Sequence, residues 1–127
     1  MARFDNILGI HEQALSVRSQ RIDLLAQNIA NAQTPGFKAR DLDFKAVLSA
    51  ATGDALRTTH GRHFALGEDQ EKDGLVYRIP LNASADGNTV ESAVEQAQFG
   101  GAAAQYQATL DFLNNRVAGL RRALRGE

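Results

Sequence analysis

The chain has 127 residues, of which 43% are apolar and 21 are alanine, so its large apolar side chains suffice for one modest core but not for two domains. The 14 basic and 15 acidic residues nearly cancel. Because no large positive field results, a general nucleic-acid-binding role is disfavoured. The absence of cysteine excludes a disulfide scaffold, a thiol nucleophile and zinc sites built on thiolates.

General secretion rules predict a cytoplasmic protein without a membrane span. Charged and polar residues interrupt residues 1–6, where a secretory signal would need an unbroken apolar run. No stretch approaches the roughly 18 apolar residues of a membrane-spanning helix.

Composition divides the chain into three parts that together predict a mainly α fold. Residues 1–33 and 88–127 have helical periodicity, whereas residues 34–87 are rich in glycine and turn-forming residues. We predict one discontinuous helical domain, in which the N- and C-terminal helices pair as an antiparallel coiled coil. The irregular middle region, with short helix and β elements, is an insert between them.

The N-terminal segment has two apolar rows. The second row, Ile10, Val17 and Leu24, repeats every seven residues about 120° from the first. One partner helix would not cover both rows, so the segment either presents a single wide face in a small bundle or contacts two neighbours. His11 interrupts the first row, and we expect it to be packed rather than catalytic. The first row contains Phe4, Ile7, Leu8, Leu15, Ile22, Leu25 and Ile29.

The middle region contains only short predicted elements. Residues 34–37 have proline and glycine at the second and third positions of a type II turn, which ends the first helix. Helical spacing predicts a short helix over residues 43–51. The alternation of Leu75, Tyr77 and Ile79 before Pro80 predicts an edge strand. The acidic run 68–74 is interpreted as a solvated loop.

No enzymatic constellation is evident in the sequence. His60 and His63 could share a metal ion on a helix, but Gly61 favours a turn and no third ligand lies nearby. Neither a phosphate-binding glycine loop nor a serine elbow is present. We therefore expect no enzyme activity, metal site or cofactor. A small hydrolase that uses these histidines is the enzymatic alternative, and it lacks a nucleophile.

The C-terminal segment is apolar on two nearly opposite faces. A helix of this kind must be covered on both sides, and the N-terminal helix can cover only one, so other copies or other subunits are expected to cover the second. Asn88 and Glu91 predict a capping box at its start, while Gly100 and Gly101 weaken its middle. One row, a coiled-coil seam, runs Phe99, Ala103, Tyr106, Leu110, Leu113, Val117, Leu120 and Leu124; the other runs Val90, Val94, Ala97, Gly101, Ala104, Ala108 and Phe112.

Residues 30–38, Ala-Asn-Ala-Gln-Thr-Pro-Gly-Phe-Lys, resemble the signature of the bacterial flagellar rod and hook family. Asn28 lies one helical turn before this motif. Residues 59–64, 86–90, 106–108 and 112–114 resemble the proximal rod proteins of the family, and the short chain fits that group. The chain departs from the pattern at Ala102, where such proteins usually have asparagine, and at Gly100 and Gly101.

The resemblance implies a structural subunit that assembles helically into the rod of the flagellar basal body, which is both drive shaft and export channel. It implies export from the cytoplasm to a periplasmic rod by the flagellar type III apparatus, without a cleaved signal peptide, and end regions that order on assembly. The implied partners are other copies, other rod subunits, the adaptor protein, the membrane (MS) ring and the export gate. A helical adaptor or export chaperone of a secretion system is the alternative, although it has no need for the Thr-Pro-Gly-Phe turn.

Two sets of residues follow as candidates for function. The resemblance assigns the helix–turn junction to Asn28, Asn31, Thr34, Pro35, Gly36, Phe37 and Lys38. Periodicity assigns helix packing and assembly to Leu8, Leu15, Ile22, Leu25, Ile29, Val94, Tyr106, Leu110, Phe112, Leu113, Val117, Leu120 and Leu124.

Overall fold

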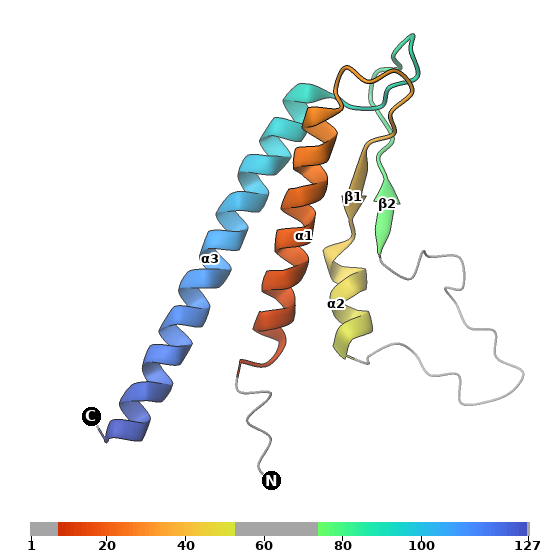
Figure 1. Ribbon diagram of the computed structural model, residues 1–127. Coiled ribbons are helices and arrows are strands. Elements are labelled where there is room, and N and C mark those ends of the chain that lie inside the picture. The colour runs from red at the N-terminus through yellow and green to blue at the C-terminus, as the bar shows by residue number, and fades with distance from the viewer. Residues whose placement is uncertain (1–7, 53–73, 127) are drawn as a thin grey trace, which may run out of the picture.

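The computed structural model describes residues 8–52 and 74–126, and it confirms the mainly α fold class (Figure 1). Long N- and C-terminal helices pack together, and a two-stranded antiparallel sheet lies in the middle region. The elements in chain order are α1 (Ile10–Ala30), β1 (Arg40–Leu42), α2 (Phe44–Thr52), β2 (Leu75–Tyr77) and α3 (Ser92–Arg125).

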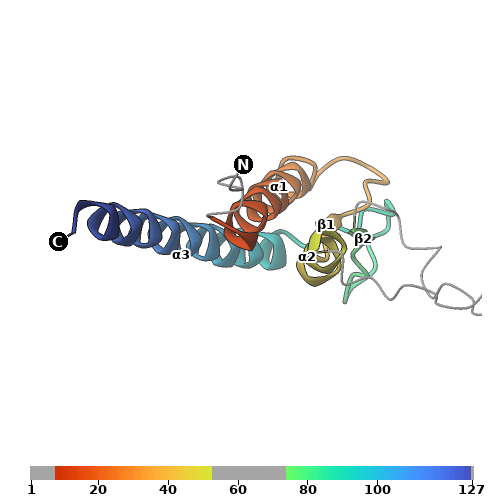
Figure 2. The ribbon, with the colours of Figure 1, turned by 90° about the horizontal axis from the view of Figure 1, so that it is seen from below.

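The helices α1 and α3 are antiparallel, since α3 begins beside the C-terminal end of α1 and runs back along it (Figure 1). With 34 residues against 21, α3 is much the longer, and the view from below shows it extending past α1 (Figure 2). Buried apolar side chains from both helices and from β1 form the core between them. They include Ala14, Val17, Leu25, Leu42, Ala102 and Leu113.

A second set of neighbours covers α1 on another side. Besides α3, α1 contacts both α2 and β1. Ile10 lines a hollow together with Leu48 of α2, and Leu24 lines another with Leu42 and Val47. α1 therefore contacts more than one neighbour, as the two-neighbour interpretation predicts.

Both long helices begin later than their periodicity predicts. Leu8 and Gly9 precede α1, and Gly9 has φ 57°, outside the helical range, so the helix starts at Ile10. The predicted capping box of α3 is wrong, because α3 begins at Ser92 and Glu91 at its N-cap makes no side-chain cap bond. Asn88 is used elsewhere: its amide bonds the end of α1, as described below.

The seam of α3 is displaced by one residue in its first half. Tyr106 is half-buried and Leu113 is buried as expected, but Ala102 is 4% exposed while Ala103 is exposed. The face toward α1 there passes through Ala102 and through Glu95, one heptad earlier. Glycines 100 and 101 remain helical, and a Cβ built on either has no neighbour within 4 Å, so close backbone approach does not account for them.

The sheet and the short helix position the middle region against α1. β1 pairs with β2 in the register Arg40↔Tyr77 and Leu42↔Leu75. The predicted strand is confirmed over Leu75–Tyr77, but Ile79 lies beyond its end. The strand β1 was not predicted, because its three residues show no recognisable alternation. The predicted short helix is confirmed as α2, and the Asp43 carboxylate accepts the Ala46 N–H at its start, 3.0 Å away.

Gly74 is held where a side chain does not fit. Its φ is +66°, and a Cβ built on it would lie 2.2 Å from Cγ2 of Val47. Gly36 has a similar φ of +73° but open space around it, so it is a matched control. We expect Gly74→Ala to lower the free energy of unfolding by about 2–4 kcal/mol, and Gly36→Ala by about 1–2 kcal/mol, as measured by urea denaturation. Equal losses would show that the contact with Val47 relaxes at no cost.

Candidate functional site

The C-terminal end of α1 is closed by the predicted turn. The Phe37 N–H donates to the Thr34 carbonyl at 3.2 Å, and the positive φ of Gly36 is the one that a type II turn requires at its third position. The Asn31 amide donates to the Gln27 carbonyl at 2.8 Å, and its oxygen accepts the Thr34 hydroxyl at 3.1 Å. The motif residues therefore end the helix and turn the chain through bonds that they make with one another.

A second loop, residues 86–89, runs alongside this turn. The Gly36 N–H donates to the Asp86 carbonyl and the Thr89 N–H to the Phe37 carbonyl, both at 2.9 Å. The Lys38 ammonium donates to the Gly87 carbonyl at 2.7 Å. Residues fifty or more positions apart are thus joined by backbone bonds. We call this region, residues 28–39 with 86–89, the junction.

Asn88 lies at the centre of the junction and is 5% exposed. Its Nδ2 lies 3.0 Å from the carbonyl oxygens of Asn31 and Ala32 and 2.8 Å from that of Thr34. Its Oδ1 accepts the Val90 N–H at 2.7 Å. These carbonyls follow Ala30, the last residue of α1, so Asn88 holds the turn after this helix from the segment that leads into α3.

Asn28 is 1% exposed and joins three elements. Its Nδ2 donates to the Arg40 carbonyl at 2.6 Å, and its Oδ1 accepts the Arg40 N–H at 3.0 Å. The side-chain amide therefore pairs with β1 as the backbone of another strand would. The same Nδ2 lies 3.1 Å from Oε2 of Glu95 in α3.

A cluster of four charged side chains, Arg21, Asp41, Arg78 and Glu95, lies next to the junction. The Arg21 guanidinium donates to both oxygens of Asp41, from Nε at 2.8 Å and from Nη2 at 3.1 Å. Arg78 donates to Asp41 Oδ2 from Nη2 at 2.9 Å. The Asp41 side chain is 17% exposed and that of Arg21 21%, so solvent screens these pairs only in part.

Glu95 completes the charge cluster from α3 and is fully buried. Its Oε1 lies 2.9 Å from Nε of Arg78, which gives ionic attraction although the N–H is not directed at the oxygen. Two cations face two carboxylates, so the cluster is formally neutral. It links α1, β1, α3 and the residue that follows β2, and none of its four side chains carries a hydroxyl or a thiol.

The cluster changes how its members titrate. Burial raises the pKa of Asp41, but the bonds from Arg21 and from the Leu42 N–H, with the charges of Arg21 and Arg78, outweigh it and leave this pKa below its ordinary value. The bond to Asp41 raises the pKa of Arg21 against the effect of burial. At the junction, bonds from the Ser84 hydroxyl and the Asn88 N–H lower the pKa of Asp86, which lies at the surface. Both carboxylates are therefore ionised at neutral pH.

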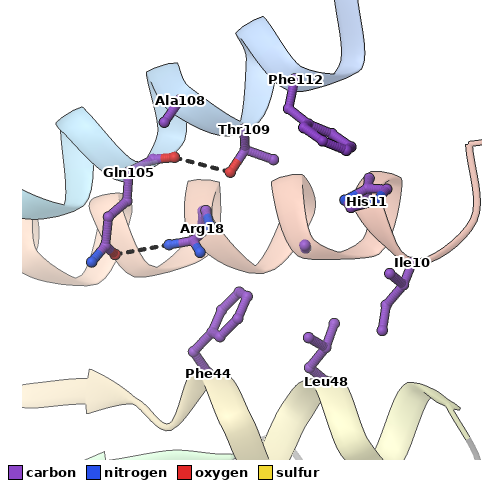
Figure 3. Close-up of a pocket in the computed structure, with 10 residues that line it drawn as sticks. Ile10, His11, Arg18, Phe44, Leu48, Gln105, Ala108, Thr109 and Phe112 are labelled. Carbon is purple, nitrogen blue, oxygen red and sulfur yellow. Dashed lines mark hydrogen bonds between the residues drawn. The ribbon is translucent and has the colours of Figure 1, made fainter. Parts of the chain in front are cut away.

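A hollow of about 400 Å³ lies between α1, α2 and α3 (Figure 3). The Phe112 ring packs on His11 with ring centroids 4.5 Å apart, and the Arg18 guanidinium lies 4.4 Å from the centre of the Phe44 ring. Arg18 also donates to Gln105 at 2.8 Å. The sequence pattern predicts that the second row of α3 points away from α1. At Phe112 this prediction is wrong, because its ring faces this hollow and packs on His11.

The structure brings all seven predicted junction residues together at the end of α1. Sequence reasoning missed the structural role of Asn88 and the whole charge cluster. One signal was present: extending the seam of α3 from Phe99 by one step of four residues reaches Glu95, so a charge falls on the packing face. Asp41 and Arg78 gave no such signal, because only the pairing of β1 with β2 brings them together.

The predicted packing residues lie in three environments. Leu25 and Leu113 are buried at 0% and 9% exposure. Phe112, Leu120 and Leu124 are 50%, 39% and 89% exposed. The remaining ones are half-buried: Leu8, Leu15, Ile22, Ile29, Val94, Tyr106, Leu110 and Val117.

Some expectations fall on other parts of the chain. Phe4, Ile7, His60 and His63 lie outside the described residues. Over residues 8–52 and 74–126, no three His, Asp or Glu side chains are grouped so as to hold a metal ion. Within the same ranges, no helix has both the length and the apolar character needed to cross a membrane.

Comparison with known proteins identifies the family. The model of the family "Flagella basal body rod protein" matches residues 8–38. Flagellar basal body rod protein FlgB of Cereibacter sphaeroides is 50% identical over 128 residues, which cover 100% of both chains. The FlgB proteins of Aeromonas hydrophila and Salmonella typhimurium are 48% and 38% identical, and each match covers 98% of this chain and 96% of the relative. The chain belongs to the FlgB family of flagellar basal body rod proteins.

The span matched by the rod-protein model coincides with a structural unit. Residues 8–38 contain α1 and the turn that follows it, which are the N-terminal half of the helix pair and the first loop of the junction. The match to the FlgB protein of Cereibacter sphaeroides covers the whole chain, so it extends over the segments that carry the charge cluster and α3. The junction therefore lies where the family pattern of α1 meets the rest of the FlgB chain.

Proposed function

We propose that the chain is a structural subunit of the flagellar basal body rod, and that other rod subunits cover the faces of α3 that α1 leaves open. The observation that carries this proposal is the apolar surface of α3 that the rest of the chain leaves uncovered. Leu113 is buried against the helix pair, whereas Leu120 is 39% exposed and Leu124 89% exposed. A free-standing helix would gain nothing from leucine at an open position, but a helix in a packed wall buries it.

The small residues of α3 suit the same role. Ala97, Gly101 and Ala104 belong to the second row and are exposed. Such a strip lets another helix approach closely, as subunits packed around a channel require. The junction and the charge cluster hold the middle region to α1 and α3, so a load applied to one element is passed to the others.

The position within the basal body is a finer proposal that rests on the family. We place the chain in the proximal rod, beside the export gate, the adaptor protein and the MS ring, and we propose that it leaves the cytoplasm through the flagellar type III apparatus without a cleaved signal. Its terminal helices would complete their order on assembly, when neighbours bury the open faces. A protein of this kind performs no catalysis.

Incorporation into basal bodies tests the proposed function. In a motile host whose own copy is deleted, the tagged chain is expected to restore swimming and to co-purify with detergent-extracted basal bodies. We expect Leu124→Glu to reduce both swimming and co-purification, because it places a charge where a neighbour must pack. The free energy of unfolding of the isolated chain should change by less than about 0.5 kcal/mol. Asn115→Glu, also at an exposed position of α3, is the matched control. A chain found only as a discrete soluble oligomer would contradict the proposal.

A further inference from the structure

The two edges of the small sheet differ in whether other parts of the chain bond their backbone groups. At the β1 edge, both backbone groups of Arg40 bond the side chain of Asn28. The next outward N–H, that of Leu42, donates to Oδ1 of Asp41 at 2.7 Å. The β1 edge is therefore closed by side chains of the chain itself.

The β2 edge is open. The Arg78 N–H donates to the Ala39 carbonyl at 2.9 Å, and the Asp43 N–H to the Gly74 carbonyl at 2.8 Å. Because bonded pairs alternate along an antiparallel ladder, the N–H and C=O groups of Leu75, Tyr77 and Ile79 point away from β1. Within the described part of the chain, no group bonds them. Figure 1 shows β2 on the side of β1 that faces away from α1.

The side chains at this edge are apolar and lie in solvent. Val76 is 44% exposed, Tyr77 60%, Ile79 90% and Leu81 86%. Open edges of natural sheets are usually protected by charges or covered, because bare apolar edges pair with other chains. The one charged side chain of the segment, Arg78, is turned inward to Asp41 and Glu95. No outward-facing charge therefore discourages pairing along Leu75–Ile79.

We propose that the β2 edge, residues 75–81, binds an extended, uncharged segment of a different protein in the rod, which adds to the sheet as a third strand next to β2. This inference rests on the proposed function. Main-chain bonds to Tyr77 and Ile79 would give affinity, and the exposed side chains would select a partner with apolar residues at alternate positions. Pro80 has no N–H, so the paired stretch ends there.

The size and symmetry of the edge argue for this occupant over a second copy. Four exposed side chains are far fewer than the ~20–30 residues per side of a stable pairwise interface. The partner must therefore be held by other contacts as well, as a neighbour in an assembly is. The β1 of a second copy is closed, and pairing of two β2 strands needs a two-fold axis, which a helical rod of one polarity does not have.

Charge substitutions at the edge test the proposal. We expect Ile79→Lys and Leu81→Lys to lower the amount of chain in purified basal bodies by at least about tenfold, with unfolding of the isolated chain unchanged because both side chains lie in solvent. Ala83→Lys, the same charge at an exposed position outside the edge, is the control and should incorporate as the wild type does. Equal incorporation of all three variants would overturn the proposal. Absence of the wild-type chain from basal bodies would instead reject the proposed function.

Site-specific photocrosslinking identifies the occupant. With benzoylphenylalanine at position 79 in living cells, we expect a crosslinked adduct between the chain and another protein of the basal body. The crosslinked peptide of that protein should have an extended conformation. The same probe at position 83 should give much less of this adduct. An adduct of two copies of this chain, an adduct to a helical segment, or no adduct at position 79 would each overturn the proposal.

Discussion

Asp41→Ala is expected to lower the free energy of unfolding at neutral pH by about 3 kcal/mol, because it leaves the part-buried guanidinium of Arg21 without its carboxylate and removes one of the two partners of Arg78. It also frees the Leu42 N–H that bonds Oδ1. Urea denaturation followed by far-UV circular dichroism measures the loss. Asp23→Ala, at an exposed position of α1, should change stability by less than about 0.5 kcal/mol. A similar loss in the two variants would mean that the charge cluster contributes no more than a surface carboxylate.

Asp41→Asn separates the charge of this residue from its shape. The pKa of Asp41 is lowered in the folded chain, so its ionised form stabilises the fold fully above the unfolded pKa, about 3.9, and this contribution is lost as the pH falls through the folded value. The difference in stability between the wild type and Asp41→Asn should therefore be constant above about pH 5 and shrink below about pH 4. Asp86 titrates alike in both proteins and cancels in the comparison. A difference that does not depend on pH would show that the charge of Asp41 is not what stabilises the fold.

The helices and the turn could be predicted because their signals are local. The apolar rows depend only on the angle per residue, and the turn at residues 34–37 depends on the fixed φ of Pro35 and the positive φ open to Gly36. The two rows of α1 also foretold its two sets of neighbours. What periodicity could not settle was the start of α3, because an asparagine before a helix can cap that helix or bond something distant.

The charge cluster could not be predicted because its partners meet only in the folded chain. Asp41 and Arg78 are brought together by a strand pair in which β1 has three residues and no recognisable alternation. No role for Glu95 follows from its place in the helical pattern, yet it is fully buried. Its burial also displaces the seam of α3, since the face that carries Glu95 carries Ala102 and not Ala103. The packed face of α3 therefore passes through Ala102, whose small side chain is 4% exposed.

Asn88→Ala is expected to destabilise the chain by about 2–3 kcal/mol, because it withdraws the buried donor that the carbonyls of Asn31, Ala32 and Thr34 share in the turn after α1. Asn88→Asp is the sharper test. The isosteric carboxylate keeps the acceptor for the Val90 N–H but places a negative charge against three carbonyl oxygens, so it should cost more than alanine does. If Asn88 acted only as a helix cap, aspartate would replace it well, since the two residues cap almost equally.

The order of the two Asn88 variants therefore decides between the roles that the sequence and the structure assign to this residue. Urea denaturation gives that order, and amide hydrogen exchange locates the effect. Loss of protection should centre on the last turn of α1 and on the Gly36 and Thr89 amides, which bond across the junction, and leave the middle of α3 unchanged. Aspartate at wild-type stability, or lost protection confined to the first turn of α3, would return Asn88 to the capping role. The junction would then depend on the backbone bonds between its two loops alone.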